Sequence, residues 1–267
     1  MTGPGPRRTV RVAQLMGMPI SLHVLQTRPD DQTVDAAAAA CWSELSEIDR
    51  VFSTYRTDSD VSRIRRGELT IERADPRVAV VAAACERARQ ATGGLFSPYW
   101  DGGFDPTGYV KGWTVEAAAR AHLQPLVARA GVVAAGINAG GDMQLFTAAD
   151  ADWTWHVGIE HPSLPGRVIA TVDVCEGAVA TSGIAQRGAH ILDPRTGHAA
   201  LEVASATVVA DSLTVADVWA TAVVVAGAPV AAAVAACRSG IIVGADGSVR
   251  RWAGGVQIAV HDDLLAG

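Results

Sequence analysis

Asp217 and Thr221 lie four residues apart in the otherwise apolar stretch 215–223, VADVWATAV. On a helix this spacing places a carboxylate and a hydroxyl on one face, one turn apart. A carboxylate among apolar side chains is costly to bury unless a hydrogen-bond partner or a metal ion compensates it. The pair therefore predicts either a site for a hard cation such as Mg²⁺, or the more common case of one solvated acid and one threonine on a helix.

A second candidate is Lys111, in the segment 105–113 with the sequence DPTGYVKGW. Asp105 and the Pro-Thr-Gly turn are expected to open a helix whose first turn carries the lysine. A cation near the positive end of a helix is unfavourable unless an anion lies beside it, and a phosphate group would supply that anion. A solvated lysine after a capped turn explains the same residues without a ligand.

The third candidate is the glycine-rich segment 136–142, GINAGGD. Paired glycines before an acid allow backbone amides to approach a phosphate, but they also fit a tight hairpin with a polar exit. The segment lacks the GxGxxG pattern, and the following residues 143–146, MQLF, are expected to form a strand. A Rossmann fold is therefore disfavoured, and no Walker A, HExxH or GxSxG motif occurs in the sequence.

Composition narrows the class of protein further. The 267-residue chain is 49% hydrophobic and has a net charge of −6, with no basic patch beyond Arg63, Arg65 and Arg66, so nucleic-acid binding is excluded. The apolar run 220–237 is interrupted at Gly227 and Pro229, which favours two buried helices over a membrane span.

Four scattered cysteines without a CxxC pair argue against a thiolate metal site or a disulfide scaffold and indicate a reducing compartment: Cys41, Cys85, Cys175 and Cys237. Residues 1–8 are rich in Gly, Pro and Arg, with no apolar signal region, so a flexible segment and a cytoplasmic location are expected.

Hydrophobic patterning predicts one interwoven α+β unit over residues 9–267, with mixed sheets and buried helices. The expected helices cover 33–55, 75–92 and 108–129, and further apolar helices lie near the C-terminus. The expected strands form a strand–turn–strand unit over 10–24, with its bend at 16–19, and then cover 132–139, 153–159, 168–174, 205–210, 240–245 and 256–260.

In this order, the segments resemble the ApbE family of FAD:protein FMN transferases. The matching segments are 16–17 (MG), 52–55 (FSTY), 58–59 (DS), 92–96 (TGGLF), 105–112, 138–142 (NAGGD), 181–183 (TSG), 190–197 (HILDPRTG) and 216–221 (ADVWAT). The resemblance implies a T-fold-like unit that binds FAD and Mg²⁺ and cleaves the pyrophosphate. It also implies transfer of FMN to a Thr or Ser hydroxyl of a client flavoprotein, with release of AMP.

The resemblance also implies roles for individual residues. The metal ligands fall on Asp217, Thr221 and the backbone carbonyl of Gly108, and the candidate base is His190. Flavin-nucleotide contacts fall on Met16, Tyr55, Leu95, Phe96, Ser97, Asp105, Lys111 and Ile191. These types suit the task, because a tyrosine offers a flat face to a ring system, a lysine neutralises pyrophosphate and a histidine titrates near neutral pH.

Two departures from the family pattern concern the chemistry. Ser97 stands where relatives usually carry an acid, and the segments before Asp105 and before His190 are shorter than usual. An asparagine at the Tyr55 position goes with FAD hydrolysis, so the tyrosine favours transfer. The expected activity is therefore Mg²⁺-dependent FMN transfer to a client flavoprotein. An FAD pyrophosphatase that yields FMN and AMP, and a non-catalytic flavin-binding protein, are the alternatives.

Overall fold

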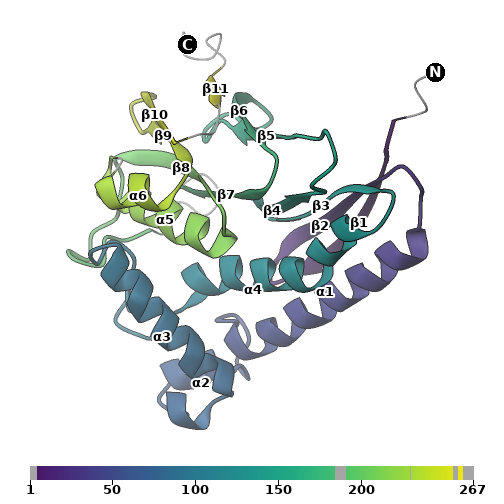
Figure 1. The fold of residues 1–267 in the computed structure, drawn as a ribbon. Helices are drawn as coiled ribbons and strands as arrows, with labels where there is room; N and C mark the ends of the chain where they lie inside the picture. Colours follow the sequence, from purple (N-terminus) through teal and green to yellow (C-terminus); the bar gives the residue numbers. More distant parts are fainter. Residues whose placement is uncertain (1–4, 184–190, 229, 255–257, 261–267) are drawn as a thin grey trace.

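The computed structural model describes residues 5–183, 191–228, 230–254 and 258–260, and it contains two sheets and a layer of helices (Figure 1). The larger sheet has eight strands in the order β1-β2-β3-β4-β7-β8-β9-β10, and each strand is antiparallel to its neighbours. Its strands are β1 (Arg7–Leu15), β2 (Met18–Gln26), β3 (Val132–Ala139), β4 (Asp142–Thr147), β7 (Gly177–Gly183), β8 (Val203–Ala210), β9 (Ser239–Gly244) and β10 (Val249–Ala253).

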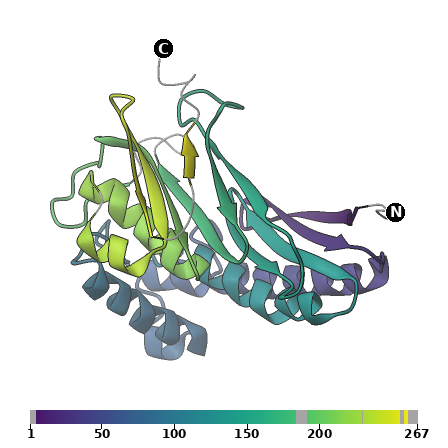
Figure 2. The ribbon, with the colours of Figure 1, turned by 45° about the horizontal axis from the view of Figure 1, so that its top comes forward.

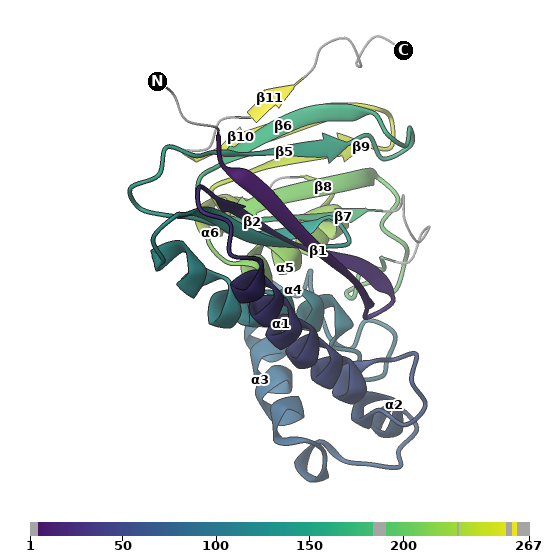
Figure 3. The same cartoon turned by 90° about the vertical axis from the view of Figure 1, so that its right-hand side faces the viewer.

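The smaller sheet has the order β11-β6-β5 and lies on the face of the large sheet opposite the helices (Figure 2). Its strands are β5 (Trp155–Glu160), β6 (Val168–Val174) and β11 (Ile258–Val260). The helices are α1 (Asp31–Phe52), α2 (Asp60–Arg65), α3 (Pro76–Ala91), α4 (Thr107–His122), α5 (Leu213–Ala226) and α6 (Ala231–Ala236). Seen from the side, α2 and α3 lie farthest from the smaller sheet (Figure 3).

The central strand β8 shows why the layers stack in this way. All eight of its residues, VASATVVA, are buried, as expected for a strand covered on both faces. Because side chains alternate along a strand, Val208 packs in the core beneath the helices, whereas Val209 packs in the core between the two sheets.

The large sheet is split between β4 and β7. β7 pairs with β8 from Ala178 to Gly183 but pairs with β4 only from Gly177 to Val179. Beyond this point the Thr181 N–H donates to the side chain of Asp142, at 2.9 Å, in place of a carbonyl of a neighbouring strand. We call this opening, bounded by Asp142 of β4 and residues 181–183 of β7, the sheet split. By the alternation of strand amides, the Gly183 N–H points into it as well.

The expected α+β class is confirmed, and several predicted boundaries shift. β1 begins at Arg7, so the predicted flexible segment 1–8 overlaps a strand. The long helix α1 ends at Phe52, and the predicted helix 108–129 ends at His122. A short 3₁₀ helix, Gln124–Ala128, follows it, because Pro125 lacks the amide that would continue an α-helix.

Candidate functional site

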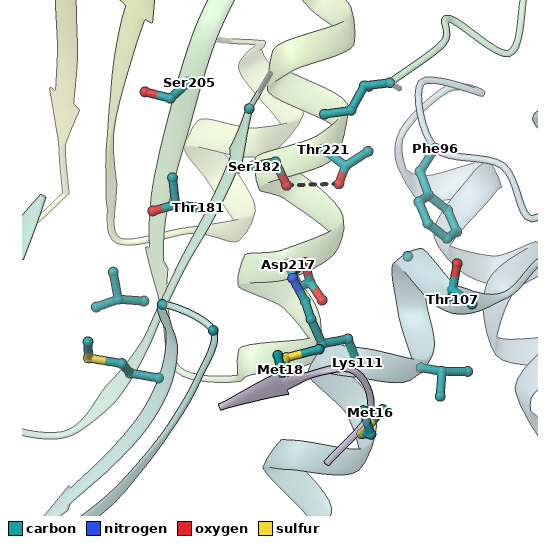
Figure 4. A pocket seen from close by; sticks show the side chains of 18 of the residues that line it. Met16, Met18, Phe96, Thr107, Lys111, Thr181, Ser182, Ser205, Asp217 and Thr221 are labelled. Atoms are coloured by element: carbon teal, nitrogen blue, oxygen red, sulfur yellow. Dashed lines mark hydrogen bonds and ion pairs between the residues drawn. The ribbon is translucent and has the colours of Figure 1, made fainter. Parts of the chain in front are cut away.

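One cavity of about 930 Å³ gathers side chains from both halves of the chain (Figure 4). It is lined by the β1–β2 turn, the loops after α1 and α3, the first turns of α4, the ends of β5 and β7, and α5. Eleven of the predicted site residues line it: Met16, Tyr55, Leu95, Phe96, Ser97, Asp105, Gly108, Lys111, Ile191, Asp217 and Thr221. The candidate base, His190, lies outside the described residues.

A buried charge cluster lies beside the sheet split. The Lys111 ammonium is 2.5 Å from Asp142 Oδ2 and 3.3 Å from Asp217 Oδ1, and both carboxylates are almost fully buried. The Gly112 N–H donates to Asp217 Oδ2 at 3.0 Å. The sequence left open whether a phosphate or solvent surrounds this lysine, and the structure places two carboxylates of the protein beside it. Lys111 is also the fifth residue of α4 and not part of its first turn.

The cluster has more negative than positive charge. Burial raises the pKa of Asp217 to about 7, against the opposing attraction of Lys111. Burial alone would lower the pKa of Lys111, but the two carboxylates outweigh it and raise that pKa, so the lysine stays charged. Two acids facing one ammonium therefore favour an additional cation or proton.

The oxygen donors near this cluster are those that Mg²⁺ prefers. Asp217 and Thr221 are one turn apart on α5, and the Thr221 hydroxyl is hydrogen-bonded to the Ser182 hydroxyl of β7 at 3.0 Å. Gly108, in the first turn of α4, also lines the cavity. Among the described residues no three His, Cys, Asp or Glu side chains cluster as metal ligands, so a cation here needs hydroxyl, carbonyl and ligand oxygens.

The outer part of the cavity is apolar and aromatic. Leu95 and Phe96 are buried, and a Cβ at Gly108 would lie 3.3 Å from the Phe96 ring, so the glycine lets ring and helix approach closely. Tyr55 is 84% exposed and therefore lies at the rim. Met16 adopts φ +53° in the β1–β2 turn, a strained conformation for a non-glycine residue. Such strain is typical of positions held in place for ligand contact.

Two predicted contact residues also have structural roles. Asp105 Oδ1 accepts the Thr107 N–H at 3.0 Å and the Thr107 hydroxyl at 2.6 Å, which fixes the start of α4. Ser97 Oγ accepts the Tyr99 N–H at 3.1 Å. Both residues line the cavity, so these bonds hold the loop and the helix that carry Phe96 and Lys111.

The turn after Ile191 is held by an ion pair between Asp193 and Arg195. The Arg195 guanidinium lies 2.7 Å from Asp193 Oδ2, and the Asp193 carboxylate also accepts the Arg195 N–H at 2.9 Å. Arg195 contributes to lowering the pKa of Asp193, chiefly through this hydrogen-bonded pair.

Sequence reasoning missed several residues of the site. Asp142 was seen only as the exit of a glycine turn, yet it joins Lys111 to the sheet split. Ser182 was part of a motif with no assigned role. Glu160 and His161 at the end of β5, and Trp100, also line the cavity. The sequence signal that could have identified Asp142 as a site residue is an acid directly after Gly140-Gly141 at the start of a strand. Only the fold shows that Lys111 faces it.

The large antiparallel sheet has helices on one face and the small sheet on the other, and it is split at the lysine–carboxylate cluster. This arrangement defines an α+β protein with a candidate ligand site between its halves.

Solved structures share this fold. The ApbE protein from Thermotoga maritima is 22% identical with a TM-score of 0.75, and the alignment covers 92% of this chain and 97% of that one. The flavin transferase ApbE from Vibrio cholerae is 20% identical with a TM-score of 0.69, covering 94% and 98%. The flavinyl transferase ApbE from Pseudomonas stutzeri is 21% identical with a TM-score of 0.68, covering 100% of both chains.

The ApbE family model matches residues 16–101 and 101–243. The chain therefore belongs to the ApbE family. No curated protein matches the sequence. In the described part of the chain, every helix is too short or too polar to cross a lipid bilayer.

Proposed function

We propose that the protein is a Mg²⁺-dependent transferase that moves FMN from FAD to a Ser or Thr hydroxyl of a client flavoprotein and releases AMP. One observation carries this proposal. The Lys111–Asp142–Asp217 cluster opens into the same cavity as the predicted flavin contacts, in a chain of the ApbE family. The structural neighbours named as flavin transferases support the same activity.

The charges of the cavity support a divalent cation in the complex with FAD. Its lining includes four acids, Asp49, Asp105, Glu160 and Asp217, but Lys111 is its only lysine or arginine among the described residues. A pyrophosphate would be repelled there without a further positive charge. Asp217, Thr221 and the Gly108 carbonyl would hold Mg²⁺, which would neutralise the pyrophosphate when bound.

The residues of the chain would then orient and activate the two reactants. Lys111 would lie against the pyrophosphate as a fixed positive charge. The acceptor oxygen attacks the phosphorus of the FMN moiety, a new P–O bond forms, and the bond to the AMP oxygen breaks, with its electron pair leaving on AMP. His190 would take the proton of the acceptor hydroxyl.

Transfer requires that water does not reach the phosphorus before the client does. Met16, held by the turn, and Tyr55, at the rim, would cover the flavin end of the cavity. Tyr55→Asn should therefore raise free FMN and AMP relative to protein-attached FMN, and chromatography together with intact mass measures this ratio. An unchanged ratio would show that Tyr55 does not select the acceptor.

The proposed function is tested by incubating the protein with FAD, Mg²⁺ and a candidate flavoprotein domain. The expected result is a mass increase of the client equal to one phosphoester-linked FMN, together with one AMP per transfer. Free FMN and AMP formed without a client would instead identify a pyrophosphatase, and FAD binding without AMP would identify a flavin-binding protein.

We also propose that the protein is cytoplasmic. Its four cysteines are unpaired in the structure, and three of them are buried. Burial raises the pKa of Cys41, Cys85 and Cys237 to about 12, which suits small core residues in a reducing compartment.

A further inference from the structure

The N-terminus of α5, the helix that carries Asp217 and Thr221, is held by side chains from other elements. The first four amides of a helix have no acceptor within the helix. Three of these amides have side-chain acceptors here: the Leu213 N–H donates to Gln144 Oε1 of β4 (3.0 Å), the Thr214 N–H to Glu116 Oε2 of α4 (3.0 Å) and the Val215 N–H to Ser212 Oγ (3.3 Å). The ordinary hydrogen bonds of the helix begin at Ala216, whose N–H donates to the Ser212 carbonyl (3.0 Å). The start of α5 is thus tied to both β4 and α4.

Glu116 makes the strongest of these links. Its Oε2 also accepts the hydroxyls of Ser212, at 2.5 Å, and of Thr214, at 2.7 Å, while Arg120 donates to Oε1 at 2.8 Å. Burial acts to raise the pKa of Glu116, but these hydrogen bonds outweigh it and lower that pKa, so the group is a carboxylate at neutral pH. A negative charge at this end of α5 also suits the helix dipole.

Successive contacts between α4 and α5 lie about one helical turn apart, four residues on α4 and three to five on α5. Glu116 bonds to residues 212 and 214, and one turn earlier on α4 the Gly112 N–H bonds to Asp217. The helices therefore run antiparallel. A further step of four residues in each helix reaches Gly108 and Thr221, about 6 Å along the axes.

We propose that Glu116, supported by Gln144, is a positioning residue that sets the axial register of α5 against α4 and thereby the spacing of the metal ligands Gly108, Asp217 and Thr221. The side chain does not line the cavity and acts through the helix. The proposal rests on the proposed function for the cation, Mg²⁺, and for its three ligands. Because the register is a property of the protein itself, it can be measured without FAD.

The test compares Glu116→Gln with Glu86→Gln, a matched change on α3, where Glu86 accepts hydrogen bonds from Arg89 and Gln90 at the surface. Mg²⁺ binding is measured by calorimetry without FAD, and thermal unfolding is recorded alongside. Removing supporting partners of metal ligands typically costs about 10–100-fold in affinity, so we expect a loss of that size in Glu116→Gln and none in Glu86→Gln. A lower Tm with unchanged Mg²⁺ affinity would overturn the proposal, because it would make Glu116 a purely structural residue.

Two further measurements keep the proposal falsifiable. If Glu116→Gln does not fold, Thr214→Val removes only one hydroxyl donor to Glu116 and should weaken Mg²⁺ binding to a smaller degree. If the wild-type protein binds no Mg²⁺ without FAD, the cation requires oxygens of the nucleotide, and hydrogen exchange of the 213–216 amides then tests the register. Faster exchange in Glu116→Gln than in Glu86→Gln supports it, and equal exchange refutes it.

Discussion

Gly112→Ala separates the geometry of the site from the stability of the fold. A Cβ at residue 112 would lie 2.9 Å from Asp217 Cβ, 2.9 Å from the Leu213 carbonyl oxygen and 3.0 Å from Asp217 Oδ2. Ordinary contacts between such atoms are about 3.5–4.0 Å, and two of these three atoms belong to backbone or Cβ positions. The added methyl group would therefore push α4 and α5 apart by roughly 0.5–1 Å.

The effects on stability and on activity should differ in size. Alanine is more favourable than glycine in a helix interior by about 1 kcal/mol, whereas overpacking costs about 1–3 kcal/mol. The free energy of unfolding should thus fall by only about 0–2 kcal/mol. A displacement of about 1 Å in a catalytic arrangement can cost on the order of 10²-fold in rate, and the shift falls directly on Asp217.

The assay measures FMN transfer and urea unfolding for Gly112→Ala and for a control, Gly103→Ala. A Cβ at Gly103 would meet only the guanidinium of Arg65, at 3.3 Å, and that side chain can move. We expect the control to keep its activity. If Gly112→Ala transfers FMN at the wild-type rate while folded, the close α4–α5 contact does not position Asp217 and the reasoning fails.

Two further predictions concern charge. Asp217→Asn should keep the fold, because an amide oxygen still accepts the Gly112 N–H. Calorimetry should show Mg²⁺ binding weakened at least about tenfold, because the neutral amide no longer attracts the cation. If FMN transfer by this variant depends on Mg²⁺ as in the wild type, Asp217 is not part of the metal site. Burial and the charge of Arg8 lower the pKa of His23 from 6.5 to about 4, so its unfolded form binds a proton in this range and its folded form does not. The free energy of unfolding should therefore fall as the pH drops from 6.5 toward 4, by about 1–2 kcal/mol after allowance for partial exposure, and urea midpoints of His23→Gln should lack this component.

The strands and helices that show clear periodicity could be predicted from the sequence. Residues 132–139 and 168–174 are strands as predicted, because β-branched and apolar residues run between turn signals. The helix 60–65 and the strands 177–183 and 249–253 were missed, since a short or glycine-containing run carries little periodic signal. Some element boundaries differ from the prediction where a capping residue fixes them. The first helix was predicted to begin at residue 33 but begins at Asp31, because the side chain of Asp30 caps it by accepting the Thr33 N–H.

The candidate site was only partly predictable, for a different reason. The i, i+4 spacing of Asp217 and Thr221 shows that they share a helix face, and α5 has that face in the cavity. Nothing local connects Lys111 with Asp142, because the pairing depends on where the third and fourth strands of the sheet end relative to α4. Glu116 reads as an ordinary surface acid for the same reason, since its partners lie about a hundred residues away.

The sheet split has a mechanical consequence. On one side of it, α1 packs with β1 and α4 packs with β3 and β4, whereas on the other side α5 packs with β7 and β8 and reaches back across the split to α4 and β4. Main-chain hydrogen bonding of the large sheet crosses this seam only through the short β4–β7 ladder at 143–145 and 177–179, so the packing of α4 on α5 supplies most of the remaining connection between the two sides. A ligand that contacts Lys111 on one side and Thr221 on the other would hold the two sides together across this seam. Occupancy of the cavity would then stiffen the whole large sheet, and the slowing of amide exchange along the 177–179 ladder would report a bound nucleotide in the absence of any chemical step.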